Sequence, residues 1–272
     1  MGAPARADRA LVVVKLGGSL ITRKREVEKL RPKVLGRLAR EIAAANAARV
    51  IVLHGAGSFG HPGAARFGLA RAPEVVGRAA ERLRGGSIVS AEVRRLHLAV
   101  LRELVRAGVP AWSVPLASIA RNREGKLDRL ETGPFEEALE RGQVPVSFGD
   151  VVPDPAWGVS ILSADVAAVE LARRLRAARV VFATDVPGVL EGLPGRRRSV
   201  VAEVTGATAA VLRPARGATD VTGGIRGKLD AMLAIAGAGA DAALISGLTD
   251  GAVSRAIRGE AVYGSWAHAR AP

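Results

Sequence analysis

VVVKLGGS, residues 12–19, joins a short apolar run to a glycine turn. The apolar, mostly β-branched residues at 11–14 predict a fully buried strand, and Lys15 stands at its end. Burying an unpaired ammonium costs free energy, so a lysine at this position makes sense if an anion lies beside it. Gly17 and Gly18 would let the backbone approach that anion and point N–H groups at it. The stretch therefore predicts a phosphate site at the carboxyl edge of a parallel sheet, where open α/β folds bind ligands.

A simpler alternative is a strand and turn whose Lys15 side chain extends into water. The stretch is not a P-loop, because that motif requires the pattern GxxxxGK[ST]. The rest of the chain has to separate the two interpretations.

Predicted strands and helices alternate along the chain. The strands are 11–14, 49–53, 109–114, 144–150, 180–183 and 241–247, and the helices are 33–48, 92–107, 134–140, 166–175, 222 to about 236, and 251–258. A tight turn is predicted at 122–126, and a short strand after the turn at 157–158. This alternation predicts an α/β fold, a three-layer αβα sandwich with a mostly parallel central sheet.

Composition sets limits on the class of protein. The chain has 272 residues, of which 49% are apolar, and no cysteine. This length suits one large α/β domain, and we expect residues 1–10 to form a flexible arm before a single domain at 11–272. No apolar run is long enough for a membrane span, and the first ten residues lack the core of a signal peptide. Without cysteine there are no disulfides, so the cytoplasm is the expected compartment.

The net charge of +14 has two interpretations, a nucleic-acid surface or a field that attracts small phosphorylated substrates. Basic residues are scattered along the predicted helices, and the one dense cluster is at 196–198. Aromatic residues are only 3% of the chain, which argues against single-strand binding. We therefore expect a small-molecule phosphate partner rather than nucleic acid or a membrane.

Several later segments carry the same signature as the first turn. Residues 54–63, HGAGSFGHPG, form a glycine-rich turn that can expose N–H groups to an anion. His61 could swing back over such an anion, although either histidine there could be an ordinary loop residue. Lys24 is a second lysine near the first turn, with a solvated surface lysine as its alternative. Asp165 follows Ser163 at a helix start, where an acidic residue is also common simply as a cap. The Gly223-Gly224 helix start is a good phosphate seat, with Lys228 in its early turns.

Taken in order, these motifs resemble the amino-acid-kinase superfamily. They are KLGGS at 15–19, HGAG at 54–57, GD at 149–150, SAD at 163–165, TDVPGV at 184–189 and TGGIRGK at 222–228. Within it, GSFGHP at 57–62 looks most like the isopentenyl phosphate kinases, and a fosfomycin-phosphorylating branch shares its Gly-His pair. The chain departs from the family pattern at Ala56 and Ala164, where glycine is usual. A positive φ at either position would be strained.

The resemblance implies ATP-dependent phosphorylation of isopentenyl phosphate, with Mg²⁺ and a homodimer. It implies an acceptor-phosphate lobe at 11–160 and a nucleotide lobe at 161–272. The implied catalytic residues are Lys15, His61, Asp165 and Lys228. Nucleotide binding is expected from Lys15, Gly17, Gly18, Ser19, Lys24, Thr184, Asp185, Gly188, Val189, Gly223, Gly224 and Lys228. Acceptor binding is expected from Gly55, Ala56, Gly57, Gly60, His61, Gly149 and Asp150, with Ile88, Val89, Val93 and Ile161 as candidates for an apolar tail pocket. No side chain is identified as a direct metal ligand.

Two other functions stay open on the sequence. A sister kinase would keep Lys15, Asp165 and Lys228 but phosphorylate fosfomycin or another phosphate or phosphonate. A nucleotide-binding protein of the same fold would bind ATP without turnover, and the intact set of two lysines and one aspartate argues against it.

Overall fold

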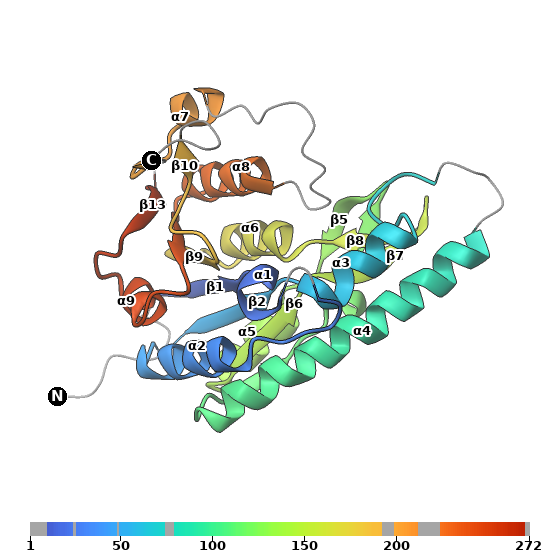
Figure 1. Ribbon diagram of the computed structural model, residues 1–272, viewed down its shortest axis with the longest axis horizontal. Helices are drawn as coiled ribbons and strands as arrows, with labels where there is room; N and C mark the ends of the chain where they lie inside the picture. The colour runs from blue at the N-terminus through green and yellow to red at the C-terminus, as the bar shows by residue number, and fades with distance from the viewer. Residues whose placement is uncertain are drawn as a thin grey trace.

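A mostly parallel seven-stranded sheet forms the centre of the protein (Figure 1). The computed structural model describes residues 10–23, 26–47, 49–73, 79–191, 199–211 and 224–269. The order of the strands is β13 (Gly264–Ala267), β12 (Asp241–Ser246), β9 (Arg179–Thr184), β1 (Val12–Leu16), β2 (Val50–His54), β6 (Val144–Phe148) and β3 (Ala111–Ser113). Neighbouring strands run parallel except the pair β12 and β13. The expected parallel sheet is confirmed, whereas its antiparallel edge strand β13 was not predicted.

Helices cover both faces of the sheet, which confirms the three-layer αβα sandwich. One face packs against α2 (Pro32–Ala44), α4 (Ala79–Arg106) and α9 (Ala252–Arg258), and the other against α5 (Gly133–Glu140), α6 (Ala164–Arg174) and α8 (Gly224–Gly237). Successive side chains of a strand point to opposite faces. Val12 and Val14 of β1 therefore pack on the face covered by α2, α4 and α9, and Leu11 and Val13 pack on the face covered by α5, α6 and α8. Lys15 continues the series of Val13 and therefore faces α6 and α8.

Two hairpins extend from the sandwich. They are β4 (Ala120–Arg123) with β5 (Lys126–Leu130), and β7 (Asp150–Asp154) with β8 (Gly158–Leu162). The predicted tight turn is confirmed, since Glu124 and Gly125 have φ values of 52° and 73°, as a type I′ turn requires. The buried Asp154 carboxylate accepts hydrogen bonds from the Gly125 N–H at 2.8 Å and from the Ser160 hydroxyl at 2.9 Å. This one side chain thus ties the two hairpins together.

The glycine-rich segment predicted as a loop at 54–63 is instead mostly a helix, α3 (Gly57–Arg66). Pro62 lies inside it and has no N–H to donate to the Ser58 carbonyl. The Glu28 N–H donates to that carbonyl at 3.1 Å instead. A tertiary contact therefore compensates for the N–H that Pro62 lacks.

Helix α4 is much longer than the predicted 92–107, because it begins at Ala79 and passes through Gly85 and Gly86. A Cβ added to Gly85 would lie 2.3 Å from the Phe67 ring, and one added to Gly86 would lie 2.8 Å from Val159. The two glycines do not break the helix. They let it pack closely against Phe67 and β8.

The remaining elements are short. They are α1 (Gly18–Ile21), the 3₁₀ turn η2 (Leu116–Ser118), β10 (Leu190–Glu191), β11 (Ser199–Val200) and α7 (Gly206–Val211). Residues 1–9 of the arm expected at 1–10 and the arginine cluster at 196–198 lie outside the described residues. Among the helices that the structure describes, none combines the length and apolar character that a membrane span needs.

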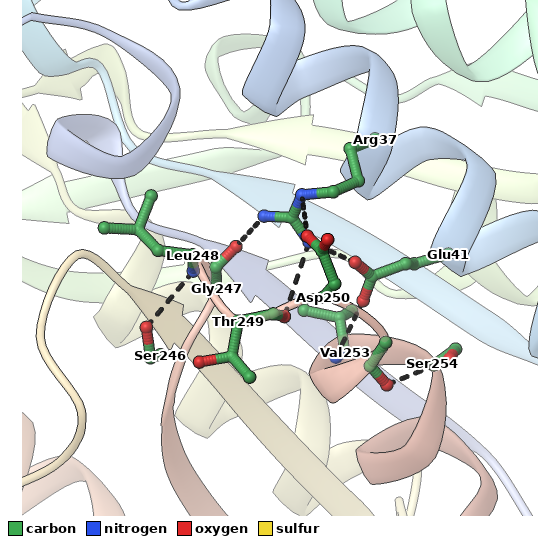
Figure 2. Close-up of polar contacts among 10 residues, drawn as sticks. Arg37, Glu41, Ser246, Gly247, Leu248, Thr249, Asp250, Val253 and Ser254 are labelled. Atoms are coloured by element: carbon green, nitrogen blue, oxygen red, sulfur yellow. Dashed lines mark hydrogen bonds and ion pairs between the residues drawn. The ribbon is translucent and has the colours of Figure 1, made fainter.

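Arg37 and Glu41 of α2 hold the turn between β12 and α9 (Figure 2). Arg37 donates to the Gly247 carbonyl and pairs with Glu41 and, at 3.1 Å, with Asp250. The second Glu41 oxygen accepts the Val253 N–H at 2.9 Å. Only 19% of the Arg37 side chain and 9% of the Glu41 side chain are exposed. The largely buried Arg37–Glu41 pair therefore anchors α9 to α2.

We expect Arg37→Met to lower the free energy of unfolding by about 3 kcal/mol, because it leaves the Glu41 carboxylate buried without its cation. Urea denaturation measures the change. Arg129→Met serves as the control, because its pair with Glu131 is exposed on both sides and should contribute less than about 1 kcal/mol. Equal losses from both substitutions would contradict the anchoring role of Arg37.

Candidate functional site

Two lysines and one aspartate meet at the carboxyl edge of β1. The Lys15 Nζ lies 2.7 Å from Asp165 Oδ1, and the Lys228 Nζ lies 3.7 Å from Asp165 Oδ2. The exposed fractions of the three side chains are 7% for Lys15, 15% for Asp165 and 21% for Lys228. Lys15 does not extend into water as a plain strand-end lysine would. It is buried, and its charge is balanced by a carboxylate from α6.

Asp165 is free to pair with lysines because another residue caps α6. The Ser163 hydroxyl is the N-cap and accepts the Val166 N–H at 3.2 Å. Burial alone would raise the pKa of Asp165, but the Lys15 and Lys228 ammoniums outweigh it and hold the pKa below its usual value. Asp165 is therefore an ionised partner of two cations at neutral pH, and not a helix cap.

The two glycine turns touch each other. A Cβ added to Gly18 would lie 2.5 Å from the Gly57 nitrogen, and one added to Gly55 would lie 2.8 Å from the Gly18 nitrogen. Helix α1 begins at Gly18 and α3 begins at Gly57, so both turns open a helix. Gly57 has a φ of +51°, whereas Ala56 has a φ of −70° and Ala164 begins α6. The strain considered for the two alanines therefore does not arise.

A cavity of about 500 Å³ joins these features, a size typical of small-molecule sites. It brings together most of the residues expected from the sequence. These are Lys15, Gly17, Gly18, Ser19, Gly55, Ala56, Gly57, Gly60, His61, Val89, Val93, Gly149, Asp150, Ile161, Asp165, Thr184, Asp185, Gly188 and Lys228.

Five expected residues are not placed on this cavity. Ile88 is 37% exposed on α4, and Val189 is fully buried in a hydrophobic core, with its N–H held by the Ser265 hydroxyl at 2.8 Å. Gly224 begins α8, and the structure does not describe its surroundings. Lys24 lies outside the described residues, as does Gly223, so the structure does not place either.

One end of the cavity is apolar. Val89 and Val93 of α4 and Ile161 of β8 line it together with Val151 of β7 and Ala64 of α3. Sequence reasoning missed Val151 and Ala64, as well as Ser58, Pro62, Ala70, Ser163, Ala164, Val186 and Leu190. Ser58, Pro62, Ser163, Ala164 and Val186 lie within the quoted motifs, which could have indicated them. Val151, Ala64, Ala70 and Leu190 lie outside those motifs, and only the tertiary structure brings them to the cavity.

Two further carboxylates in the cavity wall, Asp150 and Asp185, have hydrogen-bond partners within the protein. Asp150 is buried and accepts the Val151 N–H at 2.8 Å and an Arg94 N–H at 3.2 Å. Burial raises the pKa of Asp150 even though Arg94 lowers it. Asp185 accepts the Ser19 hydroxyl at 2.8 Å, which links the turns after β9 and β1. In the described part of the chain, no group of three or more acidic, histidine or cysteine side chains offers a metal site.

Comparisons with known proteins agree with this geometry. Residues 10–246 match the model of the amino acid kinase family. The chain is 33% identical to the isopentenyl phosphate kinase of Methanothermobacter thermautotrophicus, over 94% of this chain and 98% of the relative. It is 37% identical to the isopentenyl phosphate kinase of Haloferax volcanii, over 83% and 88% of the two chains. A crystal structure of isopentenyl phosphate kinase superposes with a TM-score of 0.83 at 30% identity, covering 94% of this chain and 99% of the other.

We expect Asp165→Asn to lower the free energy of unfolding by about 3 kcal/mol at neutral pH, because Lys15 stays buried without a counterion. The pKa of Asp165 is lowered on folding, so its contribution is fully present above the unfolded pKa of about 4 and is lost as the pH falls through the folded pKa. The unfolding free energies of wild type and variant should therefore converge in acid. Urea titrations between pH 3 and 8 test this, with Asp128→Asn as an exposed control. A difference that stays constant over this range would contradict the ionised pairing.

Proposed function

The chain belongs to the amino acid kinase family and, within it, to the isopentenyl phosphate kinases, and we propose that it transfers the terminal phosphoryl group of ATP to isopentenyl phosphate, giving isopentenyl diphosphate and ADP. One observation carries the proposal. A single cavity holds a lysine-aspartate-lysine cluster beside two glycine turns at one end and aliphatic side chains at the other. A phosphate with a short apolar tail fits both ends.

The residues would act mainly through position and charge. Phosphoryl transfer needs aligned reactants and neutralised charge more than covalent catalysis. The acceptor phosphate is a nucleophile at neutral pH, since its second pKa is about 6. Lys15 and Lys228 would hold the transferring group, and Asp165 would orient both ammoniums between them. The contact between Gly18 and Gly57 would bring donor and acceptor phosphates close to one line.

ATP and Mg²⁺ belong to this proposal. The nucleotide phosphates would lie at Lys15, Lys228 and the turn at 17–19, and the base and ribose would lie beside the turn at 184–188. Residues 11–160 would then form mainly the acceptor lobe, and residues 161–272 would form the nucleotide lobe. Asp165 is engaged by two lysines and Asp185 by Ser19, so these carboxylates leave Mg²⁺ to be held largely by phosphate oxygens and water. When bound, Mg²⁺ would neutralise charge on the ATP phosphates.

The apolar end of the cavity favours isopentenyl phosphate over the fosfomycin alternative. At ~0.8 kcal/mol per buried carbon, a five-carbon tail would gain roughly 4 kcal/mol of binding against Val89, Val93 and Val151. A three-carbon phosphonate would fill less of the same wall. Fosfomycin phosphorylation remains the second candidate because the Gly60-His61 pair suits any acceptor phosphate or phosphonate.

We also propose a cytoplasmic homodimer. Exposed apolar side chains support a second subunit, namely Leu98 and Val105 on α4, which are 47% and 59% exposed, and Trp112 on the edge strand β3, which is 49% exposed. Apolar groups gathered at a sheet edge often mark a protein contact. The absence of cysteine supports a reducing compartment.

ADP release from ATP and Mg²⁺ tests the function, with isopentenyl phosphate, dimethylallyl phosphate and fosfomycin as parallel acceptors. We expect the highest kcat/KM with one of the two isoprenoid phosphates. Lys15→Ala controls for contaminating kinases and should lose at least about 100-fold in kcat, because it removes a charge from the transferring phosphoryl group. Faster turnover with fosfomycin would show that fosfomycin, and not isopentenyl phosphate, is the acceptor. No turnover with any acceptor would favour a nucleotide-binding protein without kinase activity.

Variants of His61 test which part of the cavity binds the acceptor and which part binds the nucleotide. It lies exposed on α3 and lines the cavity. His61→Ala should lower kcat/KM for isopentenyl phosphate by on the order of 10²–10⁴, whereas His61→Gln should keep part of the activity because an amide can still donate a hydrogen bond. The KM for ATP should change little in both variants. A variant that weakens ATP binding and leaves the acceptor KM unchanged would show that the two sites are assigned the wrong way round.

A further inference from the structure

Two buried histidines lie behind the second glycine turn, and the transfer scheme above does not use them. His54 ends β2 with 0% of its surface exposed, and His97 lies on α4 with 5% exposed. The Nε2 atom of His54 and the Nδ1 atom of His97 are 3.1 Å apart. Both rings lie against Phe148, with centroid distances of 5.4 Å and 4.3 Å. Packing holds the pair in one arrangement.

Hydrogen bonds continue from both ends of this pair. The Nδ1 atom of His54 lies 3.1 Å from the Gly55 carbonyl oxygen, and the Nε2 atom of His97 lies 2.8 Å from the Ser113 hydroxyl. A carbonyl oxygen only accepts, so His54 must carry a proton on Nδ1. If each ring is neutral and has one proton, His97 donates from Nδ1 to His54, and Ser113 donates to His97. A single arrangement of protons satisfies the whole chain.

The surroundings keep both rings neutral. Burial lowers the pKa of His54 to about 4 and that of His97 to about 2. The Lys15 ammonium disfavours a charge on His54, and the Arg94 guanidinium disfavours a charge on His97. Arg94 itself is paired with the Asp150 carboxylate. The direction of the hydrogen bonds is therefore the same throughout the physiological pH range.

This series of hydrogen bonds fixes the orientation of the Gly55–Ala56 peptide group in the turn after β2. The Gly55 N–H donates to the Leu16 carbonyl at 2.9 Å, and its carbonyl accepts from His54. The described peptide bonds are all trans, so the Ala56 N–H points opposite to the Gly55 carbonyl. Ala56 lines the cavity, and in the described part of the chain its N–H has no backbone acceptor.

We propose that His54 and His97 are positioning residues that hold the Ala56 N–H toward the acceptor phosphate. The inference rests on the acceptor site proposed above. It adds a role for a residue on α4, 43 positions beyond His54, which no motif indicates. His54 and His97 do not touch the substrate in this scheme, because the Gly55–Ala56 peptide lies between them and the cavity.

Steady-state kinetics of three His97 variants tests the role. His97→Asn can keep a donor near the Nδ1 position, whereas His97→Gln places its amide near Nε2 and His97→Leu has none. We expect Asn to keep the acceptor KM within about threefold, and Gln and Leu to raise it about tenfold, the effect of one lost hydrogen bond. The KM for ATP should stay within about twofold. His268→Asn is the exposed control. If all three variants change both KM values equally, or change only the melting temperature, His97 is merely structural.

Two-bond ¹H–¹⁵N spectra of the four histidines test the geometry without any activity. We expect both His54 and His97 to be neutral Nδ1–H tautomers between pH 5 and 8, with the His97 signals identified by their loss in His97→Leu. An Nε2–H tautomer or a titration in this range would overturn the inference. The His61 variants keep the two proposals apart: if His61→Ala leaves the acceptor KM unchanged, the acceptor site is misplaced, whatever tautomers the buried rings have.

Discussion

The free energy of burying the Lys15 ammonium is the constraint on which the rest of the site depends. A lysine with 7% of its side chain exposed needs a carboxylate, and Asp165 supplies it at 2.7 Å. That requirement places the start of α6 against the end of β1. The second oxygen of Asp165 then pairs with Lys228 on α8. Three elements far apart in the chain therefore meet at one point because one charge cannot be buried alone.

Close contact between backbones is the second constraint. The turns after β1 and β2 approach so closely that neither Gly18 nor Gly55 has room for a side chain. Parallel neighbouring strands end at the same edge of the sheet, so their turns meet there. The lysine cluster and the aliphatic side chains of α4 and β7 line the same cavity as these turns. The cavity thus changes from cationic to apolar along its length.

The site buries polar groups in two different ways. Lys15, Asp165 and Lys228 stay charged and are balanced by one another. His54 and His97 stay neutral and form a continuous series of hydrogen bonds that runs from the Ser113 hydroxyl to the Gly55 carbonyl. Charge suits groups that meet phosphate, because the field must reach the ligand. Neutral rings suit the layer behind, because they fix a peptide orientation without adding a charge that would need its own partner.

The sequence by itself determined the parallel sandwich and the strand that carries Lys15, because apolar runs and glycine turns are local signals. It implied Asp165 and Lys228 as partners of that lysine only through the resemblance to a kinase family, because no local pattern says which distant residues meet. Only the tertiary structure decided the extent of α3 and α4, since Pro62 and Gly85 are tolerated through contacts with Glu28 and Phe67. It also decided which apolar side chains line the cavity. Ile88 and Val89 are adjacent in sequence, yet one is exposed and one is buried. Helix rotation against neighbouring elements makes that choice, and no local pattern records it.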